Sequence, residues 1–180
     1  MERTKKSFNI LTNDPSFTAW GWAVINKDGR VLKTGCIQTK PSNKKLRIRK
    51  GDDRVRRIGE LAHALMDVIN EFDVRYIVGE LPHGSQNAQA AIMIGATAAI
   101  IQTISEVTQI GVEWYGESDS KKCLLGKQAS TKQEMIDAIE KYYDVPWTGI
   151  KFRDEAVADA IAIYHVATTQ SSTLKLMKSM

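Results

Sequence analysis

The sequence contains only two cysteines, Cys36 and Cys123, which lie far apart and without the spacing of metal-binding pairs. We therefore expect free thiols in a reducing compartment, and a zinc site built on cysteine is excluded. A long hydrophobic run is also missing: residues 90–101, the longest apolar-rich stretch, are too short and too interrupted to predict a membrane span. The basic N-terminal residues are followed by no apolar segment with a cleavage site, so no secretion signal is expected.

No long polar tract predicts disorder either. The chain has 180 residues, of which 43% are hydrophobic and 26% charged, and this is enough to bury a sizeable core. We expect a single domain over residues 1–180, with an ordered core at about residues 8–168 and a frayed C-terminal tail. We also expect a cytoplasmic location, in the host cell if the gene is viral, with an organelle matrix left open.

Positive charge is concentrated in one segment. The formal net charge is +4, but residues 40–57 alone carry nine Lys or Arg against two Asp, a local excess of seven, so the remainder is weakly acidic at −3. A dense basic segment on an acidic body is typical of a protein that binds a polyanion, because each neutralised phosphate releases counterions. The alternative is an ordinary solvated loop.

The first forty residues have the pattern of an antiparallel meander. Residues 8–13, 19–25 and 30–39 are predicted strands, and Asp28-Gly29 supplies a hairpin turn between the second and third. In the second strand Trp20 and Trp22 share one face, which favours core packing or a dimer contact over stacking on nucleic acid. A basic loop is expected over residues 40–51.

The period then changes to that of helices alternating with strands. Apolar residues at intervals of three and four, from Val55 to Phe72, predict a helix of about five turns with Arg54 and Arg57 off its apolar stripe. Strands are expected at 74–79 and 111–115, and helices at 86–107, 118–125, about 130–143 and 154–168, the third with a capping-box start at residues 130–134. This order predicts an α/β fold: a mixed sheet of three antiparallel strands followed by parallel strands, flanked by helices.

Two acidic residues follow predicted strands directly. Asp14 ends the first strand before Pro15, and Glu80 ends the apolar strand at 74–79. Sheets with parallel strands place their ligands outside the carboxyl ends of the strands. A single Asp-Pro is more often the start of a turn, but two acids in this position indicate a site.

The last predicted helix carries a third acidic group. At about 100° per residue, Glu155 and Asp159 lie about 40° apart around the helix and one turn apart along it, so both can face one point, whereas Asp154 points elsewhere. Favourable interaction with the helix dipole explains acids in the first turn but not Asp159. Four carboxylates on three elements suit hard divalent ions such as Mg²⁺ or Mn²⁺, and two such ions could promote hydrolysis of a phosphodiester.

These residues resemble a known family. Residues 14–25 are similar to the opening Asp-Pro-Gly and Gly-aromatic motif of RuvC-type Holliday junction resolvases. Further matches follow in the family's order: Gly79-Glu80, a helix with Ala91, Gly95 and Ala98, two lysines at the family's spacing, and the segment around Asp159. The resemblance covers about residues 8–168. It implies an RNase H-like fold, a homodimer, Mg²⁺-dependent cleavage and a four-way DNA junction as substrate.

The resemblance also implies roles for individual residues. Asp14, Glu80 and Asp159 correspond to metal-binding carboxylates, and Lys121 and Lys132 to groups that contact phosphate or stabilise charge. The family's fourth acid usually lies three residues before the last Asp, where this chain has Ala156, and we assign that role to Glu155 in preference to Asp154. Ser16 stands where the family usually has Gly.

The remaining assignments concern DNA. His83 occupies the loop in which bacterial resolvases use an aromatic side chain, so it either stacks on a base or caps the loop. The basic insert does not align with the bacterial family, and we expect it to enlarge the DNA-contacting surface without reading bases. Its candidate contacts are Lys44, Lys45, Arg47, Arg49 and Lys50. The small-residue helix at 86–107 is the expected dimer interface.

The principal hypothesis is a crossover junction endodeoxyribonuclease that acts as a dimer with two Mg²⁺ ions per active site, replaceable by Mn²⁺. The ions would be held by four acids: Asp14, Glu80, Glu155 and Asp159. Lys132 or Lys121 would offset the negative charge that develops during the reaction. Two alternatives stay open. One is a less selective nuclease acting on flaps, forks or hybrids, and the other is a junction-binding protein whose catalytic centre has decayed.

Overall fold

The computed structural model describes residues 8–127 and 130–179. The strands are β1 (Asn9–Asp14), β2 (Ala19–Asn26), β3 (Val31–Gln38), β4 (Val74–Glu80) and β5 (Gly111–Tyr115). The helices are the short 3₁₀ helix η1 (Lys44–Leu46), α1 (Lys50–Glu71), α2 (Ala88–Thr108), α3 (Glu117–Leu125), α4 (Lys132–Glu140), α5 (Lys151–Gln170) and α6 (Ser172–Ser179).

The five strands form one mixed sheet in the order β3-β2-β1-β4-β5. β1, β2 and β3 pair antiparallel, whereas β4 runs parallel to β1 and β5 parallel to β4. The predicted hairpin is present, since the Asn26 side-chain oxygen accepts from the amides of Asp28 and Arg30, and Gly29 has a φ of +91°. The predicted fold class is therefore confirmed.

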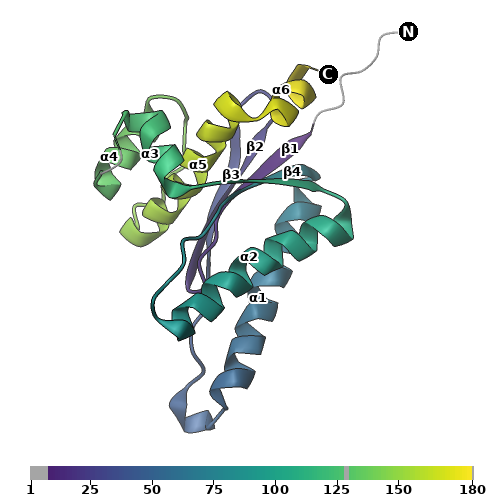
Figure 1. Ribbon diagram of the computed structural model, residues 1–180, viewed down its shortest axis with the longest axis vertical. Helices are drawn as coiled ribbons and strands as arrows, with labels where there is room; N and C mark the ends of the chain where they lie inside the picture. Colours follow the sequence, from purple (N-terminus) through teal and green to yellow (C-terminus); the bar gives the residue numbers. More distant parts are fainter. Residues whose placement is uncertain (1–7, 128–129, 180) are drawn as a thin grey trace.

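Helices cover both faces of the sheet (Figure 1). One face packs on α5, with Ile10, Ala23 and Val78 meeting Ile161 in a continuous core. The opposite face packs on α1 and α2, and its core includes both strand tryptophans, Trp20 and Trp22. The expected use of the tryptophan pair in core packing is thus confirmed. Because side chains alternate along a strand, every second residue of each strand belongs to the α5 face.

Helix α5 approaches the sheet closely at one point. A Cβ built on Gly21 of β2 would lie 2.0 Å from the Ala156 carbonyl oxygen and 2.9 Å from the Ala156 Cβ. Only a residue without a side chain fits there. In the sheet Gly21 is the register partner of Asp14, so this contact fixes the start of α5 beside the end of β1.

Some expectations were wrong in detail. The C-terminal tail is not frayed: α5 extends to Gln170, and α6 follows with Leu174 only 1% exposed. Val55, expected on the apolar stripe of α1, is 69% exposed. Arg57, placed off that stripe, is buried. Its guanidinium lies 4.1 Å from the Phe17 ring centroid, and this cation–π contact stabilises the charged group in its buried position.

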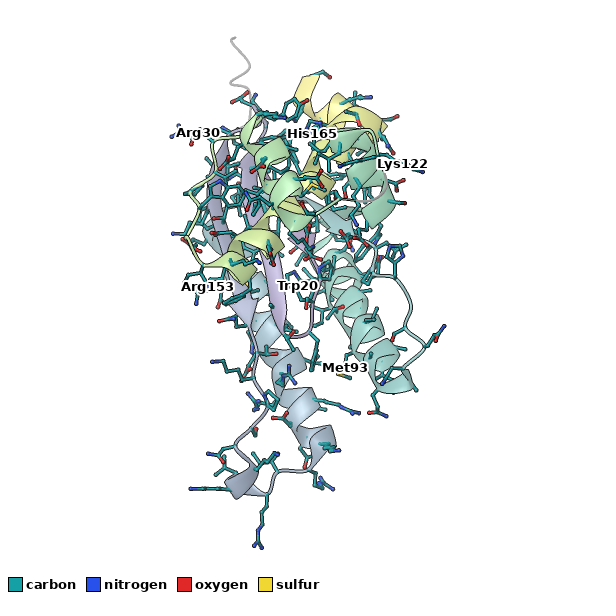
Figure 2. All side chains as sticks on the ribbon, turned by 90° about the vertical axis from the view of Figure 1, so that its left-hand side faces the viewer. Trp20, Arg30, Met93, Lys122, Arg153 and His165 are labelled. Atoms are coloured by element: carbon teal, nitrogen blue, oxygen red, sulfur yellow. The ribbon has the colours of Figure 1, made fainter. Side chains whose placement is uncertain are left out.

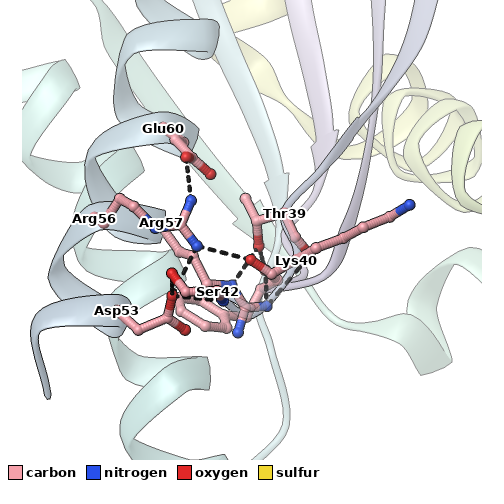
Figure 3. A network of polar contacts seen from close by, with 8 residues as sticks. Thr39, Lys40, Ser42, Asp53, Arg56, Arg57 and Glu60 are labelled. Atoms are coloured by element: carbon pink, nitrogen blue, oxygen red, sulfur yellow. Dashed lines mark hydrogen bonds and ion pairs between the residues drawn. The ribbon is translucent and has the colours of Figure 1, made fainter. Parts of the chain in front are cut away.

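A polar network anchors the connection between β3 and α1 (Figure 3). The Arg57 Nε donates to the Thr39 hydroxyl at 2.9 Å, and Arg56 donates to the Lys40 carbonyl at 2.7 Å. From the first turn of α1, Asp53 accepts from both the amide (2.9 Å) and the hydroxyl (2.5 Å) of Ser42. These bonds hold the two ends of the connection against the body of the protein.

Beyond this network the chain projects from the body. The segment of residues 43–50, which we call the basic tip, lies past the sheet at the lower end of Figure 1, and its side chains spread into solvent in Figure 2. All of its residues are exposed, including Leu46 at 66%. The predicted loop thus contains the 3₁₀ turn η1, and α1 begins at Lys50.

Helix α2 is apolar yet poorly covered. It spans 21 residues, and among the described helices it alone is long and apolar enough to cross a membrane by length and composition. The apolar stretch is therefore longer than residues 90–101 suggested. Ile92 is 54% exposed and Val107 78% exposed, although the helix packs on α1 and β5. Such a surface is typical of a protein contact.

Candidate active site

Asp14 and Asp159 lie on the same side of the sheet. The buried Thr12 hydroxyl on β1 donates to the Ala160 carbonyl of α5 at 2.5 Å, so Thr12 faces that helix. Asp14 is two residues further along the strand and therefore shares this face. Asp159 directly precedes Ala160. The sequence reasoning placed these two acids at one site, and the structure brings them to one end of β1.

Glu80 joins them from the neighbouring strand. Val78 of β4 packs in the core under α5, and alternation places Glu80 on the same face. β1 and β4 are parallel, with Asn13 the register partner of Gly79, so the carboxyl ends of the two strands are adjacent. Both strand-end acids are half-buried. In the described part of the chain, neither the Asp14 nor the Glu80 carboxylate has a hydrogen-bond or ion-pair partner.

Lys132 supplies a cation at the same place. It is the first residue of α4, where the predicted capping box is present: the Glu134 amide donates to the Thr131 hydroxyl at 3.2 Å and the Thr131 amide to the Glu134 carboxylate at 2.8 Å. From this fixed start the Lys132 ammonium forms an ion pair with Asp159. Burial lowers the pKa of Lys132, but the charge of Asp159, the hydrogen bond to it, and the charges of Asp14 and Glu117 together outweigh burial, and the pKa is raised.

The electrostatics show an excess of negative charge. Burial, and then the charge of Asp159, raise the pKa of Asp14 to about 7. Burial, and then the charges of Asp14 and Asp159, raise the pKa of Glu80 to about 8. Burial also raises the pKa of Asp159, although Lys132 acts in the opposite direction. Carboxyl groups perturbed in this way at the end of a sheet mark a functional site.

The donor set fits a divalent cation. Carboxylate oxygens are the ligands preferred by Mg²⁺ and Mn²⁺, and a cation would relieve the repulsion that raises these pKa values. Across residues 8–127 and 130–179, no three acidic, histidine or cysteine side chains are already arranged as metal ligands. The acids therefore share an edge of the sheet without forming a finished coordination shell.

The candidates for the fourth acid, Asp154 and Glu155, lie in the first turns of α5. Asp154 is buried and accepts from the amide and hydroxyl of Thr148, both at 2.8 Å, so it closes the loop before the helix. Glu155 lies 4.0 Å from the Lys151 ammonium. Both line a cavity of about 720 Å³ beside Lys132. Neither is among the charges that shift the pKa of Asp14, Glu80 or Asp159.

The residue that sequence reasoning missed is Glu117. It opens α3, two residues after β5 ends, and its charge raises the pKa values of Asp14, Glu80 and Asp159. Lys121 forms an ion pair with Glu117, and the His83 Nε2 lies 3.7 Å from its Oε2. The two predicted DNA contacts near the site, Lys121 and His83, therefore meet at this carboxylate. The sequence signal that could have identified Glu117 is its position just beyond a predicted parallel strand.

Comparison with known proteins identifies the family. A family model described as Crossover junction endodeoxyribonuclease RuvC matches residues 10–165. The chain belongs to the RuvC family. The RuvC of Photorhabdus laumondii is 27% identical over 168 residues, which cover 90% of this chain and 88% of that protein. The RuvC of Chlorobium phaeobacteroides is 24% identical over 139 residues, or 76% of this chain and 70% of that protein.

Solved RuvC structures share the fold. Thermus thermophilus RuvC in complex with Holliday junction substrate matches with a TM-score of 0.68 and 18% identity, covering 89% of this chain and 93% of that one. The yeast mitochondrial Holliday junction resolvase matches with a TM-score of 0.64 and 9% identity, covering 96% and 82%. The RNase H-like fold expected from the resemblance is thus confirmed, and RuvC membership implies dependence on a divalent metal.

The raised pKa values predict how the stability of this RuvC chain depends on pH without metal. In the unfolded chain Asp14 and Glu80 have ordinary pKa values of 3.8 and 4.5, and folding raises these to about 7 and about 8. Protons therefore bind the folded form better, so this stabilisation is complete below about pH 4 and is lost as the pH rises through 7 to 8. Asp14→Asn removes one ionisation and should melt about 5 °C above the wild type at pH 9, but close to it at about pH 4.

Thermal unfolding of both proteins in a metal chelator across this pH range measures the effect. Asp67→Asn, which changes an exposed acid on α1, is the matched control and should track the wild type at every pH. A constant difference between Asp14→Asn and the wild type from pH 5 to 9 would contradict the assigned ionisation.

Proposed function

We propose that this chain is a metal-dependent, structure-selective endonuclease that resolves four-way DNA junctions by paired hydrolysis of phosphodiester bonds. The observation that carries the proposal is that Asp14, Glu80 and Asp159, from β1, β4 and α5, share one face at the carboxyl edge of a RuvC-family sheet. That family is named for its activity, crossover junction endodeoxyribonuclease.

The residues of the site have distinct tasks in this proposal. Asp14 and Glu80, which have no ion-pair partner among the described residues, hold the cation, and Asp159 completes its surroundings from α5. Lys132 keeps an ammonium beside Asp159, where it opposes the negative charge that builds up on the attacked phosphate. A bound divalent ion supplies Lewis acidity toward the phosphate and lowers the cost of deprotonating the attacking water. We propose Mg²⁺ in this role, two ions per site, with Mn²⁺ as a substitute.

Two surfaces fit the proposed partners. Thermus thermophilus RuvC, which shares this fold, was solved with a Holliday junction substrate, and the exposed basic tip gives this chain a surface for the phosphates of such branched DNA. The exposed apolar side of α2, with Ile92 and Val107, fits a second copy of the chain, because a dimer would cover it. We further propose that the protein acts in the cytoplasm.

The test is to incubate the purified protein with Mg²⁺ and a labelled immobile four-way junction, and to map the nicks on all four strands. We expect paired nicks on opposing strands and much weaker cleavage of linear duplex, flap, fork and RNA–DNA hybrid substrates. Equal cleavage of all branched substrates would support the less selective nuclease instead. Tight binding without nicks at any Mg²⁺ or Mn²⁺ concentration would support a decayed junction-binding protein.

The basic tip should act on binding rather than on chemistry. Neutralising three of its charges with Lys44→Gln, Lys45→Gln and Arg47→Gln removes phosphate contacts. Each lost contact should reduce the slope of log K against log salt by about 0.9, so the full loss is between about 2 and 3. Fluorescence anisotropy with a labelled junction in Ca²⁺, at salt concentrations from 50 to about 200 mM, measures that slope.

A matched triple variant away from the tip tests whether net charge alone explains the result. Lys33→Gln, Lys122→Gln and Lys175→Gln remove the same charge from β3, α3 and α6, where the side chains are exposed. We expect its salt slope to stay near that of the wild type. Equal slopes for the two triple variants would show that the tip makes no phosphate contacts of its own.

A further inference from the structure

Glu117 occupies the third strand end on the catalytic side of the sheet. β5 runs parallel to β4, and Tyr115 is the register partner of Glu80. The pairing continues one residue further, since the Leu81 amide donates to the Tyr115 carbonyl at 2.8 Å. Gly116 then turns the chain into α3, whose first residue is Glu117. Acids therefore follow β1, β4 and β5, the three neighbouring strands whose carboxyl ends meet at this edge.

The contacts of Glu117 join two segments next to the site. Its carboxylate is paired with Lys121 one helical turn later and lies 3.7 Å from His83 in the loop that follows Glu80. The side chain is 40% exposed, and its charge acts on Asp14, Glu80 and Asp159. It is thereby held between the two segments, β4–α2 and α3, that border the catalytic edge.

The two acids in the first turns of α5 have other partners. The Asp154 Oδ1 accepts from the amide and the hydroxyl of Thr148, and Glu155 lies 4.0 Å from the Lys151 ammonium in the cavity that Lys132 also lines. The position three residues before Asp159 is Ala156, whose carbonyl group lies close to Gly21 and which carries no acid. Asp159 is the acid of α5 whose charge raises the pKa values of Asp14 and Glu80.

The balance of charge at this edge then points to a divalent cation. Asp14, Glu80, Glu117 and Asp159 carry four negative charges when ionised, whereas Lys121 and Lys132 carry two positive charges. The deficit is two positive charges. Asp14 and Glu80, which have no partner among the described residues, are where that deficit lies.

We propose that Glu117, supplied by the start of α3, is the fourth acidic residue of the cation site in this chain and takes the place of the acid that the family usually has at the position of Ala156. This inference rests on the proposed function, because it concerns the same cation. In the metal-free protein Lys121 neutralises Glu117. Glu117 and Lys121 therefore set the affinity of the site for a divalent ion in opposite directions.

The experiment is isothermal titration calorimetry of the intact protein with Mn²⁺, without DNA, so that the readout is independent of cleavage. Glu117→Gln should weaken Mn²⁺ binding about tenfold, as is usual when a group supporting a metal site is lost. Glu155→Gln is the matched control on α5 and should change the affinity less than about twofold. Lys121→Gln removes the competing cation and should strengthen binding, and the double variant should behave like Glu117→Gln.

The outcomes separate this inference from the proposed function. If Asp14→Asn abolishes Mn²⁺ binding while Glu117→Gln leaves it unchanged, the inference is overturned and the proposed function stands. If Glu155→Gln weakens binding as much as Glu117→Gln was expected to, the fourth acid lies on α5 and the inference is again overturned. If the wild type binds no Mn²⁺, both fail. Circular dichroism melts of each variant exclude loss of folding as the cause.

Discussion

Replacing Asp14 with asparagine is expected to lower the rate of junction cleavage by about three orders of magnitude, the scale on which loss of a group that stabilises transition-state charge is felt. The side chain keeps its size, but it loses the negative charge that would hold a cation at the end of β1. Binding of the junction in Ca²⁺ should stay within about twofold of the wild type, because Asp14 is half-buried and the basic tip is untouched.

Single-turnover nicking of a labelled four-way junction in Mg²⁺ measures the chemical step, and anisotropy in Ca²⁺ measures binding. Asp67→Asn on α1 provides the matched control, since it makes the same substitution at an exposed position outside the site. Cleavage by Asp14→Asn at the wild-type rate would remove Asp14 from the mechanism. A parallel loss of binding would instead show that the residue supports the DNA-binding surface.

The second large effect is expected on folding. Gly21→Ala places a Cβ 2.0 Å from the Ala156 carbonyl oxygen, a distance at which backbone must move. Helix α5 packs along β1 and β2, so it cannot yield at Ala156 without disturbing the Thr12 bond to Ala160. We expect a loss of about 3 kcal/mol or more in the free energy of unfolding, at the upper end of overpacking effects.

Urea denaturation followed by circular dichroism provides the measurement. Gly59→Ala is a control of opposite sign: Gly59 lies inside α1, and a Cβ there meets nothing within 4 Å. That substitution should stabilise the protein by about 0.5–1 kcal/mol, because alanine favours the helix over the unfolded chain. A Gly21→Ala protein as stable as the wild type would show that α5 approaches β2 less closely than described.

The strand ends were predictable from sequence because their signal is local. An apolar run fixes the strand, its last residue fixes the edge, and the parallel order brings Asp14 and Glu80 together. The mixed sheet followed from the same periodicities. Glu117 obeys this rule as well. It went unnoticed because β5 is short and two residues, Tyr115 and Gly116, separate its apolar part from the acid.

The surroundings of α5 were harder to predict because they depend on tertiary packing. Helical geometry correctly placed Glu155 and Asp159 on one side of the helix, but it could not say how far the helix slides along the sheet. The contact of Ala156 with Gly21 decides that, and together with the Thr12 bond to Ala160 it sets Asp159 near the end of β1. The burial of Arg57 also depends on tertiary packing. Its charge predicted an exposed side chain, whereas contact with the Phe17 ring and a hydrogen bond to the Thr39 hydroxyl stabilise it in a buried position.

The anchoring network around Arg57 and Asp53 separates the basic tip from the catalytic edge of the sheet, so that the two can change independently in evolution. Residues 43–50 lie between Thr39 and Ser42 on one side and Asp53 and Arg57 on the other, which are bonded to each other, so the length or composition of the segment can change without moving the end of β1. Insertions in this segment alter DNA binding, whereas substitutions at the sheet edge alter the hydrolysis of the phosphodiester bond. Descendants of this chain can therefore acquire preferences for differently shaped DNA while keeping the same hydrolytic centre.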